Sequence, residues 1–476
     1  MSANPDFNEI MKRRRELTAG PLYQLPDSVV QEAVDRIRRK TPKSEELYRR
    51  AKECMPGGAE HMLVNKNPYP ITVASANGTS IHDVDGNRYL DYFMMAGPVI
   101  LGHNYKPLIK KIKKVLDSEG VGTGWTTEYE IKAIELIKKH FKSVELFRYF
   151  QSGTEANMAA ARAVRVYTGK KKIMKLGGTY QGWADQFTYE MHIPYSGGFE
   201  SAGIPEEFFQ QLVCVPPNDV DALENAFRDA EAEGGIAAVF IEPMGGESGA
   251  TPMDPSYPKI LRDLCDRYQS LLVFDEVVTA FRIGMGGAQE YYGVDADMTI
   301  FGKILTHGFP SSGGVGGKKD IIECFVAGLQ PGKGHAFVGG TMGANPISTA
   351  ATYYGLSLIE KEDAVGKAAA MGDALRSGLN QLFEKMGFPF FAYNYKSIVH
   401  FETAAPIAVD IREPDGIPNA LNRKQAVDNL GVALIAENII TKYGNRAFTC
   451  MAHTDKDIQV TLAAFEKILG KMEKAA

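Results

Sequence analysis

The sequence lacks the marks of several large protein classes. Its five cysteines lie far apart and form no C-x-x-C pair, so we expect neither a zinc site nor a disulfide framework. No apolar run approaches the roughly 18 residues of a membrane span, and no apolar segment follows the basic run at 12–15, so neither a membrane span nor a secretory signal is predicted. A net charge of −5 gives no excess of basic residues that would indicate nucleic-acid binding. We therefore expect a reduced, cytoplasmic protein that binds no metal, membrane or nucleic acid.

The familiar short signatures of catalysis are missing as well. The dinucleotide fingerprint G-x-G-x-x-G does not occur, and no Gly-Lys pair is followed by Ser or Thr. Neither G-x-S-x-G nor H-E-x-x-H is present. These absences argue against a Rossmann-type dinucleotide enzyme, a P-loop enzyme, a hydrolase with a nucleophile elbow and a zinc protease.

What the chain does contain is enough apolar material for two or three packed units, because 44% of its 476 residues are hydrophobic. From residue 106 onward, short apolar segments alternate with helical ones. This pattern is typical of a mostly parallel α/β sheet covered by helices on both faces. The expected strands are 147–150, 172–176, 237–242, 271–276 and 298–302. The expected parts of the chain are an N-terminal helical extension at 1–45, the first part of a small domain at 46–105, a large domain at 106–345 and the second part of the small domain at 346–476.

Small residues stand where the first of these strands ends. Ser152, Gly153 and Thr154 open an alanine-rich helix directly after the strand at 147–150. Backbone N–H groups at a helix N-terminus favour a phosphate dianion. A plain helix cap, Ser or Thr followed by Glu, would explain the same residues. Taken alone, these three residues leave both interpretations open.

Three larger side chains follow other strands of the same sheet. Asp275 could hold a proton on a heterocyclic nitrogen, or lie as a surface acid past the sheet edge. Lys303, behind a glycine, could form a Schiff base if its pKa is lowered, or be solvated. Tyr180, between glycines, could lie flat over a ligand ring, or pack under a loop. Because the four signals follow successive strands, together they predict a pocket for pyridoxal phosphate.

The same residues belong to longer motifs. The sequence reads SGTEANMAAARAVR at 152–165, GGTYQGWADQ at 177–186, IEPMGG at 241–246, LVFDEVVTAFR at 272–282 and FGK at 301–303. In this order and spacing they resemble the class III aminotransferases, which are pyridoxal-phosphate enzymes of fold type I. The branch they resemble most is that of the glutamate-1-semialdehyde aminomutases, over nearly the whole chain from about residue 45. The resemblance implies a large domain with a mostly parallel central sheet between helices, and a smaller α+β domain built from both chain ends.

The resemblance also implies a role for each matching residue. Lys303 would carry the cofactor as a Schiff base and shuttle the substrate proton, and Asp275 would pair with the pyridine nitrogen. Tyr180, the third implied catalytic residue, would enclose the ring together with Val277. In this family Thr341 lies where the partner subunit completes the phosphate site, which implies a homodimer with shared active sites. The implied cofactor contacts are Ser152, Gly153, Thr154, Tyr180, Glu242, Asp275, Val277, Lys303 and Thr341.

Positions on the substrate side depart from the aminomutase pattern. No arginine occurs between Arg50 and Arg88, although relatives usually place one there for the substrate carboxylate. Ala96 replaces an aromatic residue, and Gln181 replaces a histidine. Arg446 could supply another carboxylate clamp, since a guanidinium fork suits that role, or be a surface arginine. The candidate substrate contacts are His61, Gln181 and Arg446.

Three reactions on this scaffold stay open. The main hypothesis is an aminotransferase, which moves an amino group between a small amine and a keto or aldehyde acceptor through a Lys303 Schiff base and pyridoxamine phosphate. The second is an intramolecular aminomutase. The third is an amino-acid racemase or epimerase, in which Lys303 would serve one face of the substrate carbon and Tyr180 or His307 the other.

Overall fold

The computed structural model describes residues 5–61, 67–122, 124–326 and 334–475. The chain divides into two compact units. The terminal unit combines residues 1–106 and 363–476, and the central unit consists of residues 107–362. Residues 346–362 therefore group with the central unit. The division falls after the helix α12 (Pro346–Lys361), not before it as we expected, because α12 packs on α5 (Glu128–His140) of the same unit.

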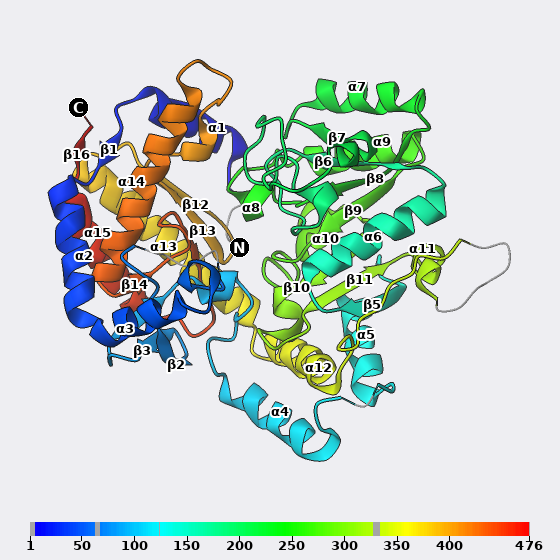
Figure 1. The fold of residues 1–476 in the computed structure, drawn as a ribbon, viewed down its shortest axis with the longest axis horizontal. Helices are drawn as coiled ribbons and strands as arrows, with labels where there is room; N and C mark the ends of the chain where they lie inside the picture. The colour runs from blue at the N-terminus through cyan, green and yellow to red at the C-terminus, as the bar shows by residue number, and fades with distance from the viewer. Residues whose placement is uncertain (1–4, 62–66, 123, 327–333, 476) are drawn as a thin grey trace. The chain divides into compact units, whose positions relative to one another are not determined.

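The central unit is built on a seven-stranded sheet (Figure 1). Its strands are β5 (Leu146–Phe150), β6 (Lys172–Leu176), β7 (Leu212–Val215), β8 (Ile236–Ile241), β9 (Leu271–Asp275), β10 (Met298–Gly302) and β11 (Gly313–Gly317). They lie in the order β5-β11-β10-β9-β8-β6-β7. Only the two pairs made by β11 are antiparallel. The predicted mostly parallel sheet is confirmed.

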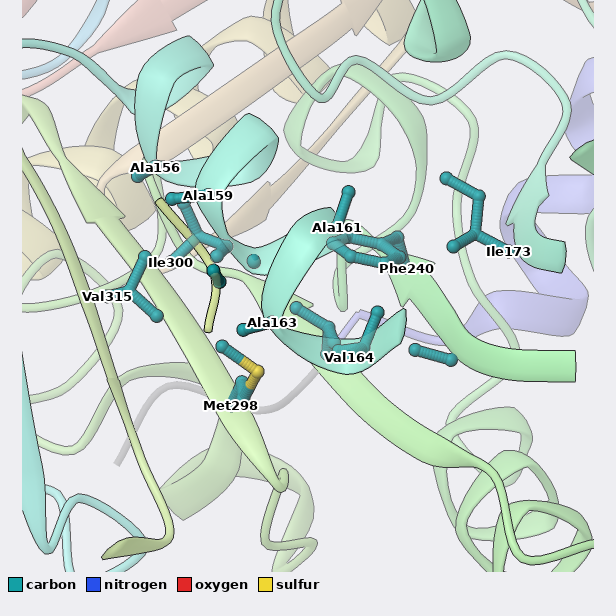
Figure 2. Packing of buried hydrophobic residues seen from close by; sticks show 14 of the residues in the cluster. Ala156, Ala159, Ala161, Ala163, Val164, Ile173, Phe240, Met298, Ile300 and Val315 are labelled. Carbon is teal, nitrogen blue, oxygen red and sulfur yellow. The ribbon is translucent and has the colours of Figure 1, made fainter. Parts of the chain in front are cut away.

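Helices cover both faces of this sheet, as the near-continuous apolar strands predict. All six residues of β8 are buried, and alternate side chains serve opposite faces. Phe240 packs in the cluster under helix α6 (Gly153–Thr168), which Figure 2 shows with Ala161 and Val164. Val239 faces the other way, into the cluster formed with α7 (Val220–Glu231) and α9 (Tyr257–Arg267). The sheet is thus fixed on two sides, and this makes the ends of its strands a rigid platform.

The alanine-rich face of α6 explains how closely this helix approaches the sheet. Ala156, Ala160 and Ala163 are fully buried against it, and small side chains leave no gap for water. The other helices of the central unit are α4 (Lys106–Glu119), α8 (Gly246–Gly249), α10 (Gly287–Tyr292) and α11 (Lys319–Ile322).

The terminal unit is α+β. The strands β2 (Val73–Asn77), β3 (Ser80–Asp83) and β4 (Arg88–Asp91) form the predicted antiparallel element with turns at Asn-Gly and Asp-Gly, and β14 (Ile439–Ile440) joins it. A second sheet holds β12 (Phe391–Tyr395), β13 (Ile398–Glu402) and β15 (Arg446–Phe448). The helices of the unit are α1 (Phe7–Ala19), α2 (Asp27–Lys40), α3 (Pro42–Ala51), α13 (Ala364–Met386), α14 (Gly416–Ala436) and α15 (Asp455–Leu469).

The N-terminal extension is part of the packed terminal unit. Helix α1 presents a stripe of Ile10, Arg14 and Leu17, all buried. The Arg14 guanidinium donates to the Tyr393 hydroxyl at 2.9 Å and pairs with the buried Glu402 carboxylate. After α1, β1 (Tyr23–Gln24) pairs with β16 (Glu473–Lys474) near the other end of the chain. Among the described residues, every helix is too short or too polar to serve as a membrane span.

Candidate active site

The candidate site lies at the carboxyl edge of the central sheet. Strands β5, β6, β8, β9 and β10 all point the same way, since β11 reverses direction between β10 and β5. The segments that follow these five strands carry the predicted residues of the cofactor pocket. This edge is where open α/β sheets bind their ligands.

The turn from β5 into α6 forms the first wall. The Ser152 hydroxyl accepts the Glu155 N–H at 3.3 Å, and the Glu155 carboxylate accepts the Gln151 N–H at 2.8 Å, so the predicted helix cap is present. The N–H groups of Gly153 and Thr154 lie in the first turn of α6, where a helix supplies no carbonyl partner. This end of the helix can therefore receive a phosphate, and the cap and phosphate interpretations are compatible.

Glycines let the neighbouring segments approach this turn. A Cβ atom on Gly313 of β11 would lie 2.3 Å from the Ser152 carbonyl oxygen. One on Gly182, whose φ is +85°, would lie 2.4 Å from the Thr154 hydroxyl oxygen and 2.7 Å from the Thr154 Cα. The loop after β6 and the start of α6 are thus in direct contact because position 182 has no side chain.

Asp275 is the buried acid of the site. It ends β9, and its carboxylate accepts the Asn157 side-chain N–H at 2.7 Å and the Val277 N–H at 3.0 Å. Burial raises the pKa of Asp275 to about 6, while these two hydrogen bonds and the Lys303 charge act against that rise. Asn157 Oδ1 is also buried and accepts no hydrogen bond from the described residues. The carboxylate and the amide oxygen together suit a cationic N–H donor.

Lys303 directly follows β10, and its charge acts to lower the pKa of Asp275. Its backbone is left-handed, with φ at +45°, and its carbonyl accepts the Ser312 hydroxyl at 3.0 Å. A Cβ atom on Gly302 would lie 2.9 Å from Val277 Cγ1, so the strand end carrying Lys303 packs tightly on Val277. Val277 also lies against Gly153, where an added Cβ would be 2.8 Å from its Cγ2. Val277 therefore connects the lysine, the acid and the phosphate turn.

Glu242 follows β8 and anchors two loops. Its carboxylate accepts the Tyr180 N–H at 2.8 Å and the Glu247 and Ser248 N–H groups at 2.9 Å each. Burial and the neighbouring Glu247 charge raise the pKa of Glu242 to about 7. Glu247 and Ser248 are both left-handed, an uncommon conformation that the carboxylate holds in place. Since all three of these bonds are to backbone, Glu242 positions the Tyr180 loop.

Tyr180 is half-buried, and burial raises its pKa, with the Glu247 and Asp275 charges adding to the effect. Its ring centroid lies 5.6 Å from that of His192, whose Nδ1 is 2.8 Å from a Glu200 carboxylate oxygen. Gln181 is fully buried and accepts the Thr179 hydroxyl at 3.2 Å, while its Nε2 has no protein partner among the described residues. The charges of nearby acids thus act on the pKa of the Tyr180 hydroxyl. The Gln181 side chain forms its hydrogen bond within its own loop.

Three predicted contacts remain to be located: Thr341, His61 and Arg446. Thr341 is exposed on a turn of the central unit next to Gln151, because a Cβ atom on Gly340 would lie 3.2 Å from the Gln151 amide. His61 and Arg446 belong to the terminal unit. His61 is exposed, while Arg446 lies on β15 with 2% of its surface exposed. Arg446 is therefore no surface arginine, but its substrate role stays a prediction.

Sequence reasoning missed Asn157, which holds the Asp275 carboxylate from a distance of 118 residues along the chain. Its place in the SGTEAN stretch, one helical turn after the phosphate turn, was the available signal. Among the described residues, no group of three or more His, Cys, Asp or Glu could hold a metal ion.

Comparison with known proteins places these residues in context. A family model, described as aminotransferase class-III, matches residues 62–389. A glutamate-1-semialdehyde 2,1-aminomutase of Thermodesulfovibrio yellowstonii is 33% identical over 453 residues, covering 91% of this chain and 100% of that protein.

Two solved structures share the fold. An omega-transaminase from Sphaerobacter thermophilus superposes with a TM-score of 0.81 and 28% identity, covering 91% of this chain and 99% of the other. A transaminase with PLP bound gives a TM-score of 0.78 and 27% identity, covering 90% of this chain and 97% of the other. Sequence and structure similarity thus extend over about nine-tenths of the chain.

Proposed function

Because the chain belongs to the class III aminotransferases and is therefore a pyridoxal-phosphate-dependent enzyme, we propose that it transfers an amino group between a small amine and a small keto or aldehyde compound. The bound cofactor supplies an aldehyde that combines with amines and a ring that withdraws electrons from the substrate carbon. Lys303 holds the cofactor through its amine and, once a substrate amine takes its place, moves a proton at the substrate carbon.

The observation that carries the proposal is the buried Asp275 beside Lys303. A carboxylate with 6% of its surface exposed is costly unless a cation faces it. Asp275 would hold a protonated ring nitrogen, and Asn157, which donates its side-chain N–H to the Asp275 carboxylate, would orient that carboxylate. Asp275 then keeps that nitrogen protonated, which is the state in which the ring withdraws electrons best. The residues of the site fit the cofactor in this respect.

The other cofactor groups have matching surfaces. The first turn of α6, at Gly153 and Thr154, offers N–H groups and a helix dipole to the phosphate. Val277 and Tyr180 are placed to enclose the ring, since Val277 packs between Gly153 and Gly302 and the Tyr180 N–H is fixed by Glu242. Glu242 positions this loop, and its own contact with the cofactor stays a prediction.

The residues on the substrate side of the site favour transfer of the amino group between two molecules over its rearrangement within one molecule. The aminomutase branch places a histidine where this chain has Gln181, and that side chain is fully buried in its own loop. No arginine lies between Arg50 and Arg88. Arg446, buried on β15, is the candidate clamp for a substrate carboxylate.

A single-turnover experiment tests the proposal. The purified holoenzyme is mixed with a panel of single amines and amino acids without any acceptor, and the visible cofactor absorbance and the carbonyl product are followed. We expect loss of the absorbance together with one equivalent of carbonyl product per site, and its reversal by a keto acid. Turnover of no donor in a broad panel by cofactor-loaded enzyme would contradict the proposal.

The alternative with specific support is the intramolecular aminomutase, because aminomutases are similar to this chain over nine-tenths of its length. In that case glutamate-1-semialdehyde would be converted to an amino ketone of the same composition, with no external acceptor and no release of a deaminated product. A racemase or epimerase would instead remove the optical activity of an amino acid without releasing a keto acid. Adding glutamate-1-semialdehyde to the panel and following optical rotation as a third signal therefore separates all three reactions.

We also propose that two copies of the chain form the active enzyme. In the central unit, large apolar side chains are exposed, among them Trp125 at 83% and Phe337 at 74%. We propose that these side chains belong to the surface between the two copies, since contiguous exposed apolar patches mark interaction sites. Thr341 lies on the turn four residues after Phe337, as expected of a residue close to such a surface.

A further inference from the structure

A buried lysine outside the predicted site holds the loop that carries Tyr180. Lys175 lies on β6 with none of its surface exposed. Its Nζ donates to three backbone carbonyl oxygens, those of Thr179 at 3.1 Å, Phe187 at 3.0 Å and Tyr189 at 2.8 Å. An ammonium group has three protons, so each proton has one acceptor.

These three carbonyls belong to both ends of one loop. Thr179 directly precedes Tyr180 near the start of the loop, while Phe187 and Tyr189 lie near its end. Thr179 and Phe187 are themselves buried, so without the ammonium their carbonyl oxygens would lose a partner that water cannot readily replace. Lys175 therefore joins the two ends of the 179–189 loop at a single point.

The charges around Lys175 suit an ammonium group. Burial lowers the pKa of Lys175 to about 8, while the negative charges of Glu200, Glu190 and Glu242 act to raise it. Burial raises the pKa of the Cys214 thiol to about 12, so that group is neutral when the lysine is charged. At neutral pH the lysine is thus mainly charged, and charge-assisted bonds to carbonyls are stronger than neutral ones.

We propose that Lys175 is a positioning residue that orients Tyr180 over the cofactor ring by tying the carbonyls of Thr179, Phe187 and Tyr189 together. Glu242 holds the same loop from the other side, through the Tyr180 N–H. The Glu242 carboxylate and the Lys175 ammonium thus hold the two polar atoms of a single peptide group, the Tyr180 N–H and the Thr179 carbonyl oxygen. The proposal rests on the proposed function only in that Tyr180 faces the cofactor.

The test compares two lysines of the same strand. Lys175→Met keeps the length of the side chain and removes all three donors. Lys172→Met is the matched control, since Lys172 lies on β6 but is paired at the surface with Glu233. Two quantities are measured on the full-length protein: the dissociation constant of pyridoxal phosphate, and hydrogen exchange of the amides in 177–190, with those of β8 as an internal reference.

We expect Lys175→Met to weaken cofactor binding about tenfold and to speed exchange in 177–190 but not in β8, because one charge-assisted anchor is lost. Lys172→Met should leave both quantities unchanged. Lys175→Arg, which retains the charge and donors, should recover part of the affinity. Equal behaviour of the Lys175→Met and Lys172→Met proteins would overturn the proposal.

A double-mutant cycle shows whether Lys175 acts through Tyr180. In a Tyr180→Ala background, Lys175→Met should have little further effect on the dissociation constant, because the ring it positions is gone. Fully additive effects would mean that Lys175 acts by another route and would overturn the proposal. If Lys175→Met does not fold, Lys175→Gln, which keeps a neutral donor, takes its place in the cycle. None of these measurements requires amino transfer, so they can fail or succeed independently of the proposed reaction.

Discussion

We expect the side-chain amine of Lys303 to be essential for catalysis. Lys303→Ala should abolish the visible absorbance of the lysine–cofactor bond and lower turnover by at least about a thousandfold, the scale of general acid–base catalysis. Lys319→Ala, which removes an exposed lysine of α11, is the control and should change neither. Absorption spectra and steady-state rates provide the measurement. A Lys303→Ala protein that retained both signals would refute the assignment of Lys303.

The buried His453 predicts a pH dependence of stability. Burial lowers its pKa from 6.5 to about 4, and its Nδ1 accepts the Cys450 N–H at 3.0 Å. The unfolded chain therefore binds an extra proton between these values, so this residue's contribution to stability is complete above pH 6.5 and falls as the pH falls toward 4. The slope contributed is at most about 1.4 kcal/mol per pH unit.

His453→Phe tests this dependence by urea denaturation. At pH 8 the variant should be less stable than the wild type by about 1–3 kcal/mol, because the buried Cys450 N–H loses its acceptor. The difference should shrink below pH 6.5, since phenylalanine binds no proton. Buried carboxyls such as Glu276, whose pKa burial raises to about 7, are common to both proteins and cancel in the comparison. A difference independent of pH would contradict the prediction.

At the scale of elements, contact between the Tyr180 loop and helix α6 is predicted to depend on Gly182. Gly182→Ala should weaken cofactor binding by about tenfold or more, because its Cβ would meet the backbone of Thr154 at 2.7 Å. Gly169→Ala is a matched control at the other end of α6. It has a similar φ of +70° but nothing within 4 Å, so it should cost only about 1–2 kcal/mol of stability. Cofactor titration and thermal denaturation of both variants check this.

Elements with strong apolar patterns were predictable, and glycine-rich or polar ones were not. The strands β6 and β10 span the residues expected for them, 172–176 and 298–302. Strand β11, with the sequence GGVGG, was missed because glycine has low strand propensity, and its close neighbours only become visible in the fold: a Cβ on Gly314 would lie 2.2 Å from the Phe147 ring. The start of helix α14 (Gly416–Ala436) is not recognisable from the sequence, since the first half of the helix is polar.

Individual residues of the candidate site could be predicted from the sequence, but the hydrogen bonds between its segments could not. Strand ends are recognisable from sequence, so Asp275 and Lys303 could be placed on one edge. The bonds from Asn157, Glu242 and Lys175 join segments far apart in the chain or lie inside a buried loop, and periodicity carries no information about them. Buried polar contacts depend on tertiary packing, which local patterns do not encode.

At the scale of the whole molecule, we predict a dimer in solution. Its mass, measured by light scattering on the holoenzyme, should be about twice the 52.2 kDa of the chain. Replacing the exposed apolar residues Trp125 and Phe337 by charged ones should shift the mass toward the monomer and lower cofactor affinity, because Thr341 of the partner subunit would be lost from the site. The matched control is Ile417→Glu, an exposed apolar residue of the terminal unit at 58%. A monomer that retains full cofactor affinity would contradict the dimer proposal.

The pairing of Arg14 with Glu402 has a consequence for a shortened form of the chain. A polypeptide that began at Met55 would lack α1, and with it the Arg14 guanidinium that pairs with the Glu402 carboxylate. Removing one member of such an interior pair costs about 3–5 kcal/mol, a large part of the stability of an ordinary domain. A polypeptide without α1 is therefore expected to unfold more readily and to be a target for cellular proteases.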